Sequence, residues 1–246
     1  MTGYAVEAVG LSKSYGALQV TRDVTLRLEP GTALGIIGPN GAGNTTLFNL
    51  LTGTVRADSG SVTLFGVDVT RVEARKRCRM GITRSFQVPQ PFGGLTVYEN
   101  VLVAATFGQG LTEWQARAPA EEALQRCGLW PKARMLAGQI GLLDRKRLEL
   151  ARSMATAPKL MLLDEIAGGL TDAECHSLIE LILSIKASGV TIIWIEHVLH
   201  ALLKVVDRVM VLDFGQKIAE GAPDKIMQSP EVAAIYLGLE EKSAHG

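Results

Sequence analysis

The stretch that decides the fold reads Gly38-Pro39-Asn40-Gly41-Ala42-Gly43-Asn44-Thr45-Thr46. A nearly continuous apolar run at residues 32–37 precedes it and predicts a strand buried on both faces. Residues 45–51, which follow, have the pattern of a helix. A buried strand, a glycine-rich loop and a helix in this order match the phosphate-binding template GxxxxGK followed by Ser or Thr, whose backbone N–H groups curl around phosphates. We therefore interpret the stretch as a nucleotide-binding loop.

The loop departs from its template at one position. Gly38, Gly43 and Thr45 stand where the template requires them, but Asn44 stands at the lysine position. Lysine brings a positive charge to the β- and γ-phosphates, whereas asparagine is neutral and donates a weaker hydrogen bond. Nucleotide binding through loop amides and the Thr45 hydroxyl is expected to survive, and hydrolysis is expected to suffer most because charge develops in its transition state. Taken alone, the stretch could also be an ordinary glycine-rich turn.

A second motif, much further along the chain, favours the nucleotide-binding interpretation. Residues 160–163 are apolar and are followed by Asp164 and Glu165. A buried parallel strand would place both carboxylates at the C-terminal edge of its sheet, where such sheets bind ligands. Asp164 would hold Mg²⁺ through water, and Glu165 would orient or deprotonate an attacking water. The alternative is that Asp164 caps a turn and Glu165 is a surface charge.

Composition and charge limit the class of protein. Apolar residues make up 47% of the 246 residues and charged residues 20%, which argues against disorder. Lysine plus arginine equals aspartate plus glutamate, so no basic excess draws the chain to nucleic acid. We find no apolar run long enough to span a bilayer and no secretion signal, and the three well-separated cysteines are typical of free thiols. These features predict a cytoplasmic protein.

Strands and helices alternate at both ends of the chain, and helices dominate the middle. Strands are predicted at residues 5–11, 20–28, 32–37, 61–64, 82–86, 160–163, 190–195 and 209–213, the last being the final core strand. Helices are predicted at residues 45–51, 118–127, 145–155, 172–187 and 198–206, and another starts at Thr96 with Glu99 as its capping-box partner. This order predicts a parallel sheet with an inserted helical subdomain, roughly residues 70–141.

At this point the chain resembles a known family, the ATPase subunits of ABC transporters, and in particular those of branched-chain amino acid importers. The resemblance extends from Tyr15 to the tail Ile235-Tyr236-Leu237-Gly238. Besides the loop, it is carried by Asp58-Ser59-Gly60-Ser61-Val62, Thr83-Arg84-Ser85-Phe86-Gln87, Leu95-Thr96-Val97-Tyr98-Glu99-Asn100-Val101 and Arg147-Leu148-Glu149-Leu150-Ala151-Arg152. It implies a single α/β domain, residues 1–246. This domain would have a P-loop NTPase core with a mostly parallel sheet (about 1–69 and 142–246), an N-terminal antiparallel β portion and an inserted α-helical subdomain (about 70–141).

The resemblance assigns roles to matching positions and implies ATP and Mg²⁺ as cofactors. Tyr15 would stack on adenine, and His197 would contact the γ-phosphate. Gln87 would touch Mg²⁺ and water and would sense the membrane partner. The alternatives are that Tyr15 packs at a strand end, that Gln87 is a solvated amide and that His197 is a core histidine. His197 and His200 have a helical spacing, but no third ligand follows at a recognisable spacing, which disfavours zinc.

Together, the implied catalytic residues are Glu165, His197 and Gln87, and the implied metal-binding residues are Thr45, Gln87 and Asp164. The implied partners are a second ATPase subunit, identical or different, membrane-spanning permease subunits and, indirectly, a periplasmic solute-binding protein. The chain would then sit on the inner face of the cell membrane through the permease. In such a pair each nucleotide site takes its phosphate loop from one chain and its signature segment from the other.

Two further segments leave the family pattern. Ile140-Gly141-Leu142-Leu143-Asp144 stands where the family usually has LSGGQ, so a serine and two glycines are missing. Ile166-Ala167-Gly168-Gly169-Leu170-Thr171-Asp172 replaces a proline-containing turn and an aspartate, for which Asp172 could substitute after a one-residue shift. The sequence thus leaves two functions open. The first is a transport ATPase with impaired hydrolysis, and the second is a nucleotide-gated binding module that hydrolyses little.

Overall fold

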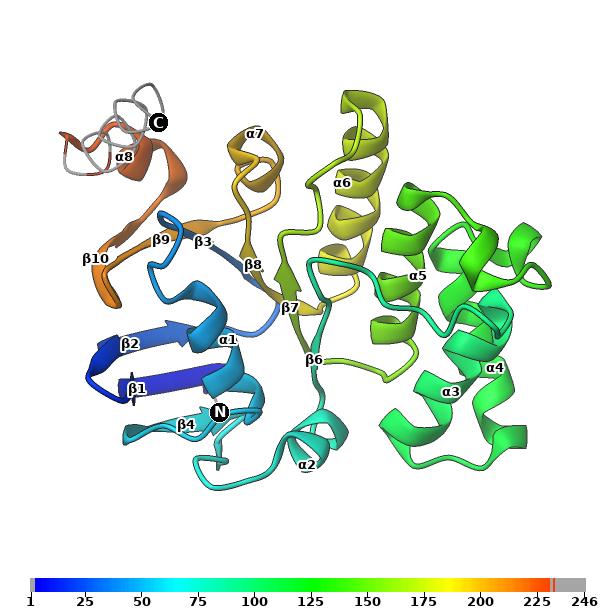
Figure 1. The fold of residues 1–246 in the computed structure, drawn as a ribbon, viewed down its shortest axis with the longest axis horizontal. Helices are drawn as coiled ribbons and strands as arrows, with labels where there is room; N and C mark the ends of the chain where they lie inside the picture. Colours follow the sequence, from blue (N-terminus) through cyan, green and yellow to red (C-terminus); the bar gives the residue numbers. More distant parts are fainter. Residues whose placement is uncertain (1–2, 231, 233–246) are drawn as a thin grey trace.

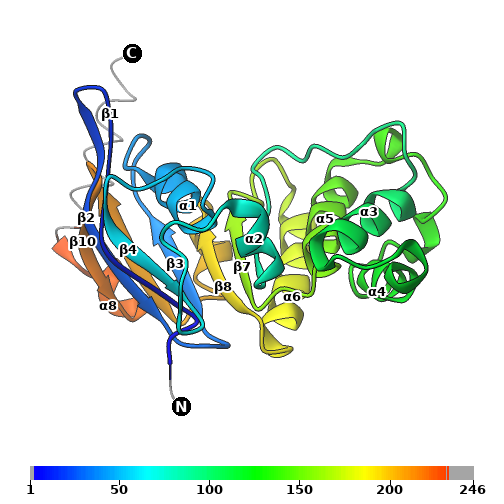
Figure 2. The ribbon, with the colours of Figure 1, turned by 90° about the horizontal axis from the view of Figure 1, so that it is seen from below.

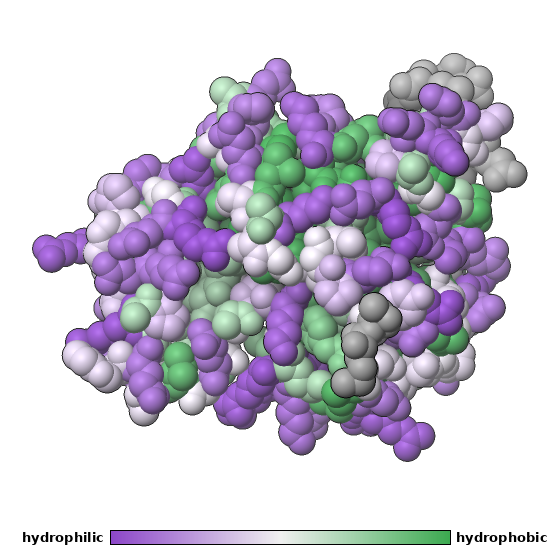
Figure 3. Space-filling model, turned by 180° about the vertical axis from the view of Figure 1, so that it is seen from behind, coloured by the Kyte–Doolittle hydropathy of each residue, from purple (hydrophilic) through white to green (hydrophobic). Residues whose placement is uncertain are grey.

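The computed structural model describes residues 3–230 and 232 and contains two sheets and a group of helices (Figure 1). The tail at residues 235–238, which the resemblance includes, lies outside these residues. The antiparallel strands lie at one end of the molecule and helices α3 and α4 at the other, as Figures 1 and 2 both show. Seen from behind, polar side chains cover most of the surface and apolar ones show between them (Figure 3).

The larger sheet has the strand order β10-β9-β3-β8-β7-β6 within the described part of the chain. Its parallel strands are β3 (Ala33–Ile37), β6 (Ile82–Arg84), β7 (Leu160–Asp164), β8 (Thr191–Ile195) and β9 (Arg208–Asp213). Every residue of β3, β7 and β8 is buried, which explains why these strands are continuous apolar runs. The prediction of a mostly parallel sheet is confirmed.

The predicted final core strand at residues 209–213 is present as β9, but an edge strand that the sequence did not indicate comes after it. β10 (Gln216–Gly221) follows and pairs antiparallel with β9 at the edge of the sheet. Half of its residues are exposed, and the Lys217 ammonium and the Glu220 carboxylate form an ion pair at 2.9 Å on its surface. Because a charged, half-exposed edge strand lacks a clear apolar alternation, its sequence is hard to distinguish from a loop.

The smaller sheet is antiparallel, with the order β2-β1-β4-β5. Its strands are β1 (Val6–Tyr15), β2 (Leu18–Leu28), β4 (Ser59–Leu64) and β5 (Val67–Asp68). This confirms the antiparallel β portion near the N-terminus. Backbone N–H of Arg22 donates to Gly215 O at 2.7 Å, which ties this sheet to the turn between β9 and β10.

Alternation along the parallel strands divides the apolar core into two layers. Leu34 and Ile36 of β3 pack with α1 (Asn44–Thr52) and the antiparallel sheet, whereas Ala33 and Ile37 pack with the helices of the other face. The same period-two division occurs in β7, β8 and β9. The helix that follows the glycine loop is therefore held between two sheets, with Phe48 fully buried.

The helices on the other face and beyond β6 are α3 (Val97–Gln109), α4 (Glu113–Arg126), α5 (Leu142–Met154), α6 (Asp172–Ala187) and α7 (Leu199–Leu202). Shorter elements are α2 (Ala74–Arg79), η1 (Trp130–Lys132), η2 (Ala137–Gln139) and α8 (Pro223–Met227). Among the described residues, no helix is both long and apolar enough to cross a bilayer. The exact division into core and helical subdomain stays a prediction.

The capping box at the start of α3 is confirmed. The Thr96 hydroxyl accepts from the backbone N–H of Glu99 at 3.1 Å, and the Glu99 carboxylate accepts from the backbone N–H of Thr96 at 2.7 Å. Three other helix boundaries differ from the prediction by three residues or more. α5 begins at Leu142 and not at residue 145. α4 begins before residue 118, behind a second capping box of Thr112 and Gln115, and its internal Pro119 resembled a helix start. α7 ends before residue 206.

Arg77 supplies a buried link that the sequence pattern did not reveal. Its side chain is 2% exposed, and its guanidinium donates to the carbonyl oxygens of Leu50 and Leu51 at the C-terminal end of α1, and to those of Thr70 and Val72. Burial lowers the pKa of Arg77, and the Asp68 carboxylate opposes this change. The carbonyls that a helix leaves unpaired at its end are thus satisfied by one cation.

We expect Arg77→Met to reduce the free energy of unfolding of the nucleotide-free chain by about 3 kcal/mol, because it leaves several buried carbonyls without a donor. Urea denaturation of the purified chain measures this change. Arg75→Met is the matched control, since Arg75 is exposed on the same helix and should leave stability nearly unaltered. Equal stability of both variants would contradict the role given to Arg77.

Candidate functional site

The glycine loop between β3 and α1 has a backbone that only glycine accommodates. Gly41 and Gly43 have left-handed φ angles of 85° and 101°. A Cβ atom on Gly43 would lie 2.6 Å from the Val20 carbonyl oxygen, and one on Gly38 would lie 2.2 Å from that of Leu212. Gly43 is also the N-cap residue of α1, so the helix begins directly at the loop. The close backbone approach explains the glycines of the motif.

A pocket of about 200 Å³ opens at this loop. Its lining residues are Val20, Pro39, Asn40, Gly41, Ala42, Gly43, Asn44, Thr45, Thr46, Glu165 and His197. The structure therefore brings most of the sequence-predicted binding residues to one place, together with two of the predicted catalytic residues. Backbone N–H groups at the start of α1 and the positive end of its helix dipole make this pocket suitable for an anion.

The pocket lining includes no lysine or arginine. Asn44, at the lysine position, has a side-chain oxygen that is buried and has no hydrogen-bond partner. Phosphate oxygens only accept hydrogen bonds, so Asn44 could contribute there only through its NH₂ group. Among the lining residues, only His197 can carry a positive side-chain charge.

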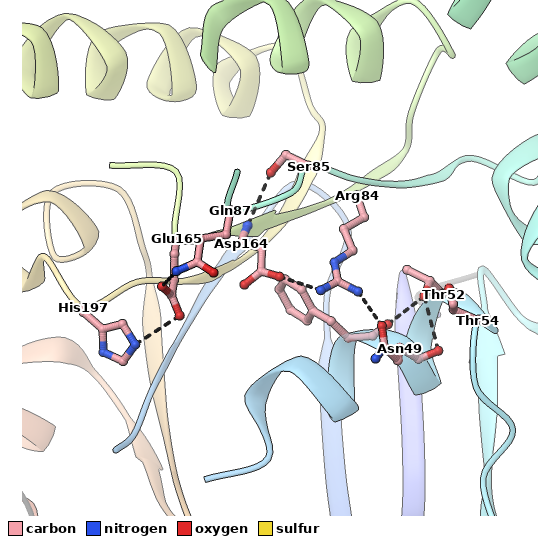
Figure 4. Close-up of polar contacts among 10 residues, drawn as sticks. Asn49, Thr52, Thr54, Arg84, Ser85, Gln87, Asp164, Glu165 and His197 are labelled. Carbon is pink, nitrogen blue, oxygen red and sulfur yellow. Dashed lines mark hydrogen bonds and ion pairs between the residues drawn. The ribbon is translucent and has the colours of Figure 1, made fainter. Parts of the chain in front are cut away.

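Gln87, Glu165 and His197 meet at the edge of the pocket (Figure 4). Gln87 Nε2 donates to Glu165 Oε2 at 2.5 Å, and His197 Nε2 lies 3.2 Å from Glu165 Oε1. Glu165 has a left-handed φ of 46°, which is uncommon for a residue other than glycine, and its N–H donates to Ile195 O at 2.8 Å. Both carboxylate oxygens of Glu165 are thus held by side chains from neighbouring loops.

Asp164, at the end of β7, is paired with an arginine that the sequence reasoning did not single out. Arg84 Nη2 donates to Asp164 Oδ2 at 2.5 Å, and Arg84 Nη1 donates to Asn49 Oδ1 of α1 at 2.6 Å (Figure 4). β6 lies beside β7 in the sheet, so strand order accounts for this meeting. Arg84 belongs to the stretch that carries the family resemblance, but nothing in its local pattern indicates which carboxylate it meets.

The donors proposed for Mg²⁺ have suitable chemistry. Thr45, Gln87 and Asp164 offer a hydroxyl, an amide oxygen and a carboxylate, and Mg²⁺ prefers such oxygen ligands. Arg84 holds one oxygen of Asp164, and the Gln87 amide nitrogen is the atom that donates to Glu165. The second carboxylate oxygen of Asp164 and the single amide oxygen of Gln87 therefore remain available. In the described part of the chain, no three His, Cys, Asp or Glu side chains gather at one point. A bound Mg²⁺ would therefore need phosphate oxygens and water as further ligands.

Tyr15 lies outside the residues that line the pocket. It ends β1, its side chain is 48% exposed, and the Lys13 ammonium lies 5.6 Å from its ring centroid. A ring so exposed contributes little to packing of the nucleotide-free chain. Its proposed contact with adenine stays a prediction.

The segment at the LSGGQ position begins a helix with apolar side chains. Gly141 is the N-cap of α5, and Leu142 is 44% exposed in the first turn. A Cβ atom on Gly169 would lie 3.5 Å from Leu142 Cδ2, so Leu142 reaches toward the loop that follows Glu165. Asp144 pairs with Lys132 of η1. Asp172, considered above as a substitute for the missing aspartate, is the first residue of α6 behind a capping box of Thr171 and Glu174.

Comparison with known proteins identifies the family. The ABC transporter family model matches residues 21–168. The high-affinity branched-chain amino acid transport ATP-binding protein LivG of Salmonella typhimurium is 36% identical over 244 residues, which cover 93% of this chain and 96% of that protein. BraF of Pseudomonas aeruginosa, which carries the same description, is 34% identical over 248 residues, with 95% and 97% covered.

A solved ATP-binding cassette of an ABC transporter in its ADP conformation has the same fold, with a TM-score of 0.88 and 30% identity over 96% of this chain and 100% of that chain. The chain belongs to the ATP-binding subunits of the ABC transporter family. The resemblance inferred from the sequence motifs is therefore confirmed, as is the fold class.

We expect Tyr15→Ala to weaken ATP affinity roughly 5- to 150-fold, which corresponds to the loss of one stacked aromatic contact. Calorimetric titration with ATP measures the affinity, and thermal unfolding of the nucleotide-free chain should be nearly unchanged. Tyr4→Ala is the matched control, because Tyr4 is also an exposed tyrosine that lies under a cation, Arg27. A large loss of stability with unchanged affinity would instead indicate that Tyr15 is a packing residue.

Proposed function

We propose that this chain is the ATP-binding and hydrolysing subunit of an ABC importer, and that Asn44 slows its hydrolysis. The observation that carries this proposal is the meeting of the glycine loop with Glu165 and His197 in one pocket, with Gln87 bonded to Glu165. The proposed solutes are branched-chain amino acids or related small molecules. The descriptions of LivG and BraF support this choice of solute.

In this proposal each group of the pocket has a physical task. The loop N–H groups and the start of α1 bind the phosphates, and Tyr15 stacks on the adenine. Mg²⁺, when held by Thr45, Gln87 and Asp164, would neutralise charge on the β- and γ-phosphates. Glu165 orients the attacking water and accepts its proton.

His197 and Gln87 both keep the Glu165 carboxylate in one orientation, because each holds one of its oxygens. His197 in addition offers the γ-phosphate a hydrogen bond. A fixed carboxylate needs little reorganisation when the water attacks, which is how positioning lowers a barrier.

Asn44 affects nucleotide binding and nucleotide hydrolysis unequally. In the ground state, a charge-assisted hydrogen bond contributes about 1.5–3 kcal/mol and a neutral one about 1 kcal/mol, so binding loses little. In the transition state, charge accumulates on the transferred phosphoryl group and the missing cation costs more. Impaired turnover with retained binding follows.

We propose that the active unit contains a second ATPase subunit and a permease. The subunits would close head to tail, each site combining one phosphate loop with the partner's α5 N-terminus. A groove of about 270 Å³ between α1, α2 and β6, lined by Arg84 and Phe86 among others, is the proposed contact for a cytoplasmic segment of the permease. Phe86, which lines this groove and is more than half exposed, directly precedes Gln87, so a partner at the groove would contact the residue next to Gln87. The chain would then be peripheral to the membrane.

The second candidate function is a nucleotide-gated binding module that closes on ATP and hydrolyses little. Two observations favour it. The pocket lining has no lysine or arginine, and Leu142 and Leu143 occupy positions where the family has glycines. The complete set of Gln87, Glu165 and His197 favours the ATPase instead, since a pure binder has no need of a positioned carboxylate.

We expect Asn44→Lys to raise ATP turnover by about 100-fold or more, because one donor at the site of developing charge has an effect of this size. The double variant Asn44→Lys with Glu165→Gln should return to the starting rate while it still binds ATP. Phosphate release with saturating ATP and Mg²⁺ measures both. Asn40→Lys is the matched control: it adds the same charge to the same loop, away from the start of α1, and should not restore turnover.

A different result separates the two candidate functions. If Asn44→Lys leaves turnover at the starting rate, the Leu142-Leu143 segment is the limiting part of a homodimer. Mixing the variant with an ATPase subunit that has an intact LSGGQ should then restore only the site built on this chain's loop. Failure of both the repair and the mixing experiment would overturn the ATPase proposal in favour of the binding module.

A further inference from the structure

A buried carboxylate, Glu196, lies between the two loops that hold the candidate catalytic side chains. It directly follows β8 and is only 2% exposed. Its hydrogen bonds connect the backbone of these two loops.

Glu196 accepts three backbone hydrogen bonds. Its Oε2 accepts from the N–H of Ala167 at 2.9 Å, and its Oε1 accepts from the N–H groups of His197 and Val198 at 3.0 and 3.2 Å. Ala167 lies two residues after Glu165, in the loop that follows β7. One carboxylate therefore bonds to the backbone on both sides of the contact between Glu165 and His197.

We propose that Glu196 is a positioning residue for ATP hydrolysis, which sets the distance between the Glu165 carboxylate and the His197 ring by clamping their two loops together. This inference rests on the proposed function. Glu196 itself does not line the pocket, so it would act only through Glu165 and His197.

The backbone of Glu165 explains why a clamp is needed. Its φ of 46° lies in the left-handed region, where a side chain other than glycine is disfavoured, and such a conformation persists only when surrounding contacts impose it. Two backbone contacts do so: the Glu165 N–H bonds to Ile195 O at 2.8 Å, and the Ala167 N–H bonds to Glu196. Loss of the second would free the loop directly beyond Glu165.

The buried Glu196 side chain is surrounded by hydrogen-bond donors. A buried carboxylate is costly unless donors compensate it, and here three backbone N–H groups do so. Lys146 is 4% exposed on α5; burial lowers its pKa, and the Glu196 carboxylate raises it. Lys146 thus places a buried charge on α5, the helix that begins at Leu142 of the signature segment.

Glu196→Gln tests the clamp, because an amide NH₂ cannot accept the N–H bonds that one carboxylate oxygen now accepts. The first readout is the ¹H–¹⁵N spectrum of the otherwise unaltered chain. The amide protons of Ala167, His197 and Val198 should move upfield and exchange faster with solvent. The matched control is Asp207→Asn: Asp207 also accepts a backbone N–H, from Ala33 at 2.8 Å, but away from the pocket, and its loss should leave these three amides unchanged.

The second readout is turnover in the Asn44→Lys background. Glu196→Gln should lower kcat about 100-fold with KM for ATP nearly unchanged, as expected for a displaced catalytic group, and Glu196→Asp should recover part of the loss because it keeps a carboxylate. Rates are expressed per folded site, counted by ATP binding. A purely structural role would lower the unfolding temperature and the folded fraction but leave kcat per site intact.

The outcomes separate this inference from the proposed function. Unchanged amides together with an unchanged kcat per site would overturn the clamp. If Asn44→Lys itself gives no turnover, the proposed repair fails and the amide spectrum alone decides whether Glu196 holds the two loops. If Glu196→Gln does not fold, the three amide resonances and kcat per folded site are measured on Glu196→Asp. Both should change in the direction expected for Glu196→Gln but by less, and no change in either would overturn the clamp.

Discussion

The constraint on which this structure depends is the tight passage of the chain from β3 into α1. The loop must turn within a few residues and present its N–H groups at the carboxyl edge of the sheet. Gly43 starts α1 with a left-handed φ and packs against the Val20 carbonyl, while Gly38 packs against that of Leu212. Since Val20 belongs to the antiparallel sheet and Leu212 to the parallel one, the loop fits only when both sheets are in place. The geometry of the pocket is therefore a consequence of the entire fold.

The positively charged side chains near the glycine loop are placed unusually. The pocket is lined by backbone donors and lacks a lysine or arginine, while an arginine stands just behind it, bonded to Asp164 and Asn49. Breaking such a nearly buried pair is costly, so Arg84 remains committed to Asp164 and is not free to replace the lysine. The two sheets and α1 thus retain the shape of a nucleotide site, and in our proposal Asn44 affects the chemistry more than the architecture.

How much could be predicted from the sequence depends on whether a feature is local. Three features have a signal within a few residues, and the structure has each of them: the buried strand before Gly38, the carboxylates Asp164 and Glu165 at the end of β7, and the capping box at Thr96. β10 was missed because its alternation is masked by charge at an exposed edge. Arg77 and Arg84 were missed because their partners lie in other elements, and Glu196 because its bond to Ala167 reaches the loop after β7. For Arg77 and Glu196 the partners are backbone groups, which leave no trace in residue identity.

The central claim is that the loop binds nucleotide phosphates through its backbone although it has no lysine. The most direct test is a titration of the unmodified, ¹⁵N-labelled chain with ATP and Mg²⁺, and separately with AMP. The account predicts that ATP shifts the amide resonances of Gly41, Gly43 and Thr45, because the β- and γ-phosphates accept hydrogen bonds there, and that AMP leaves them nearly unchanged. Amides that do not respond to ATP, or that respond equally to AMP, would contradict the claim.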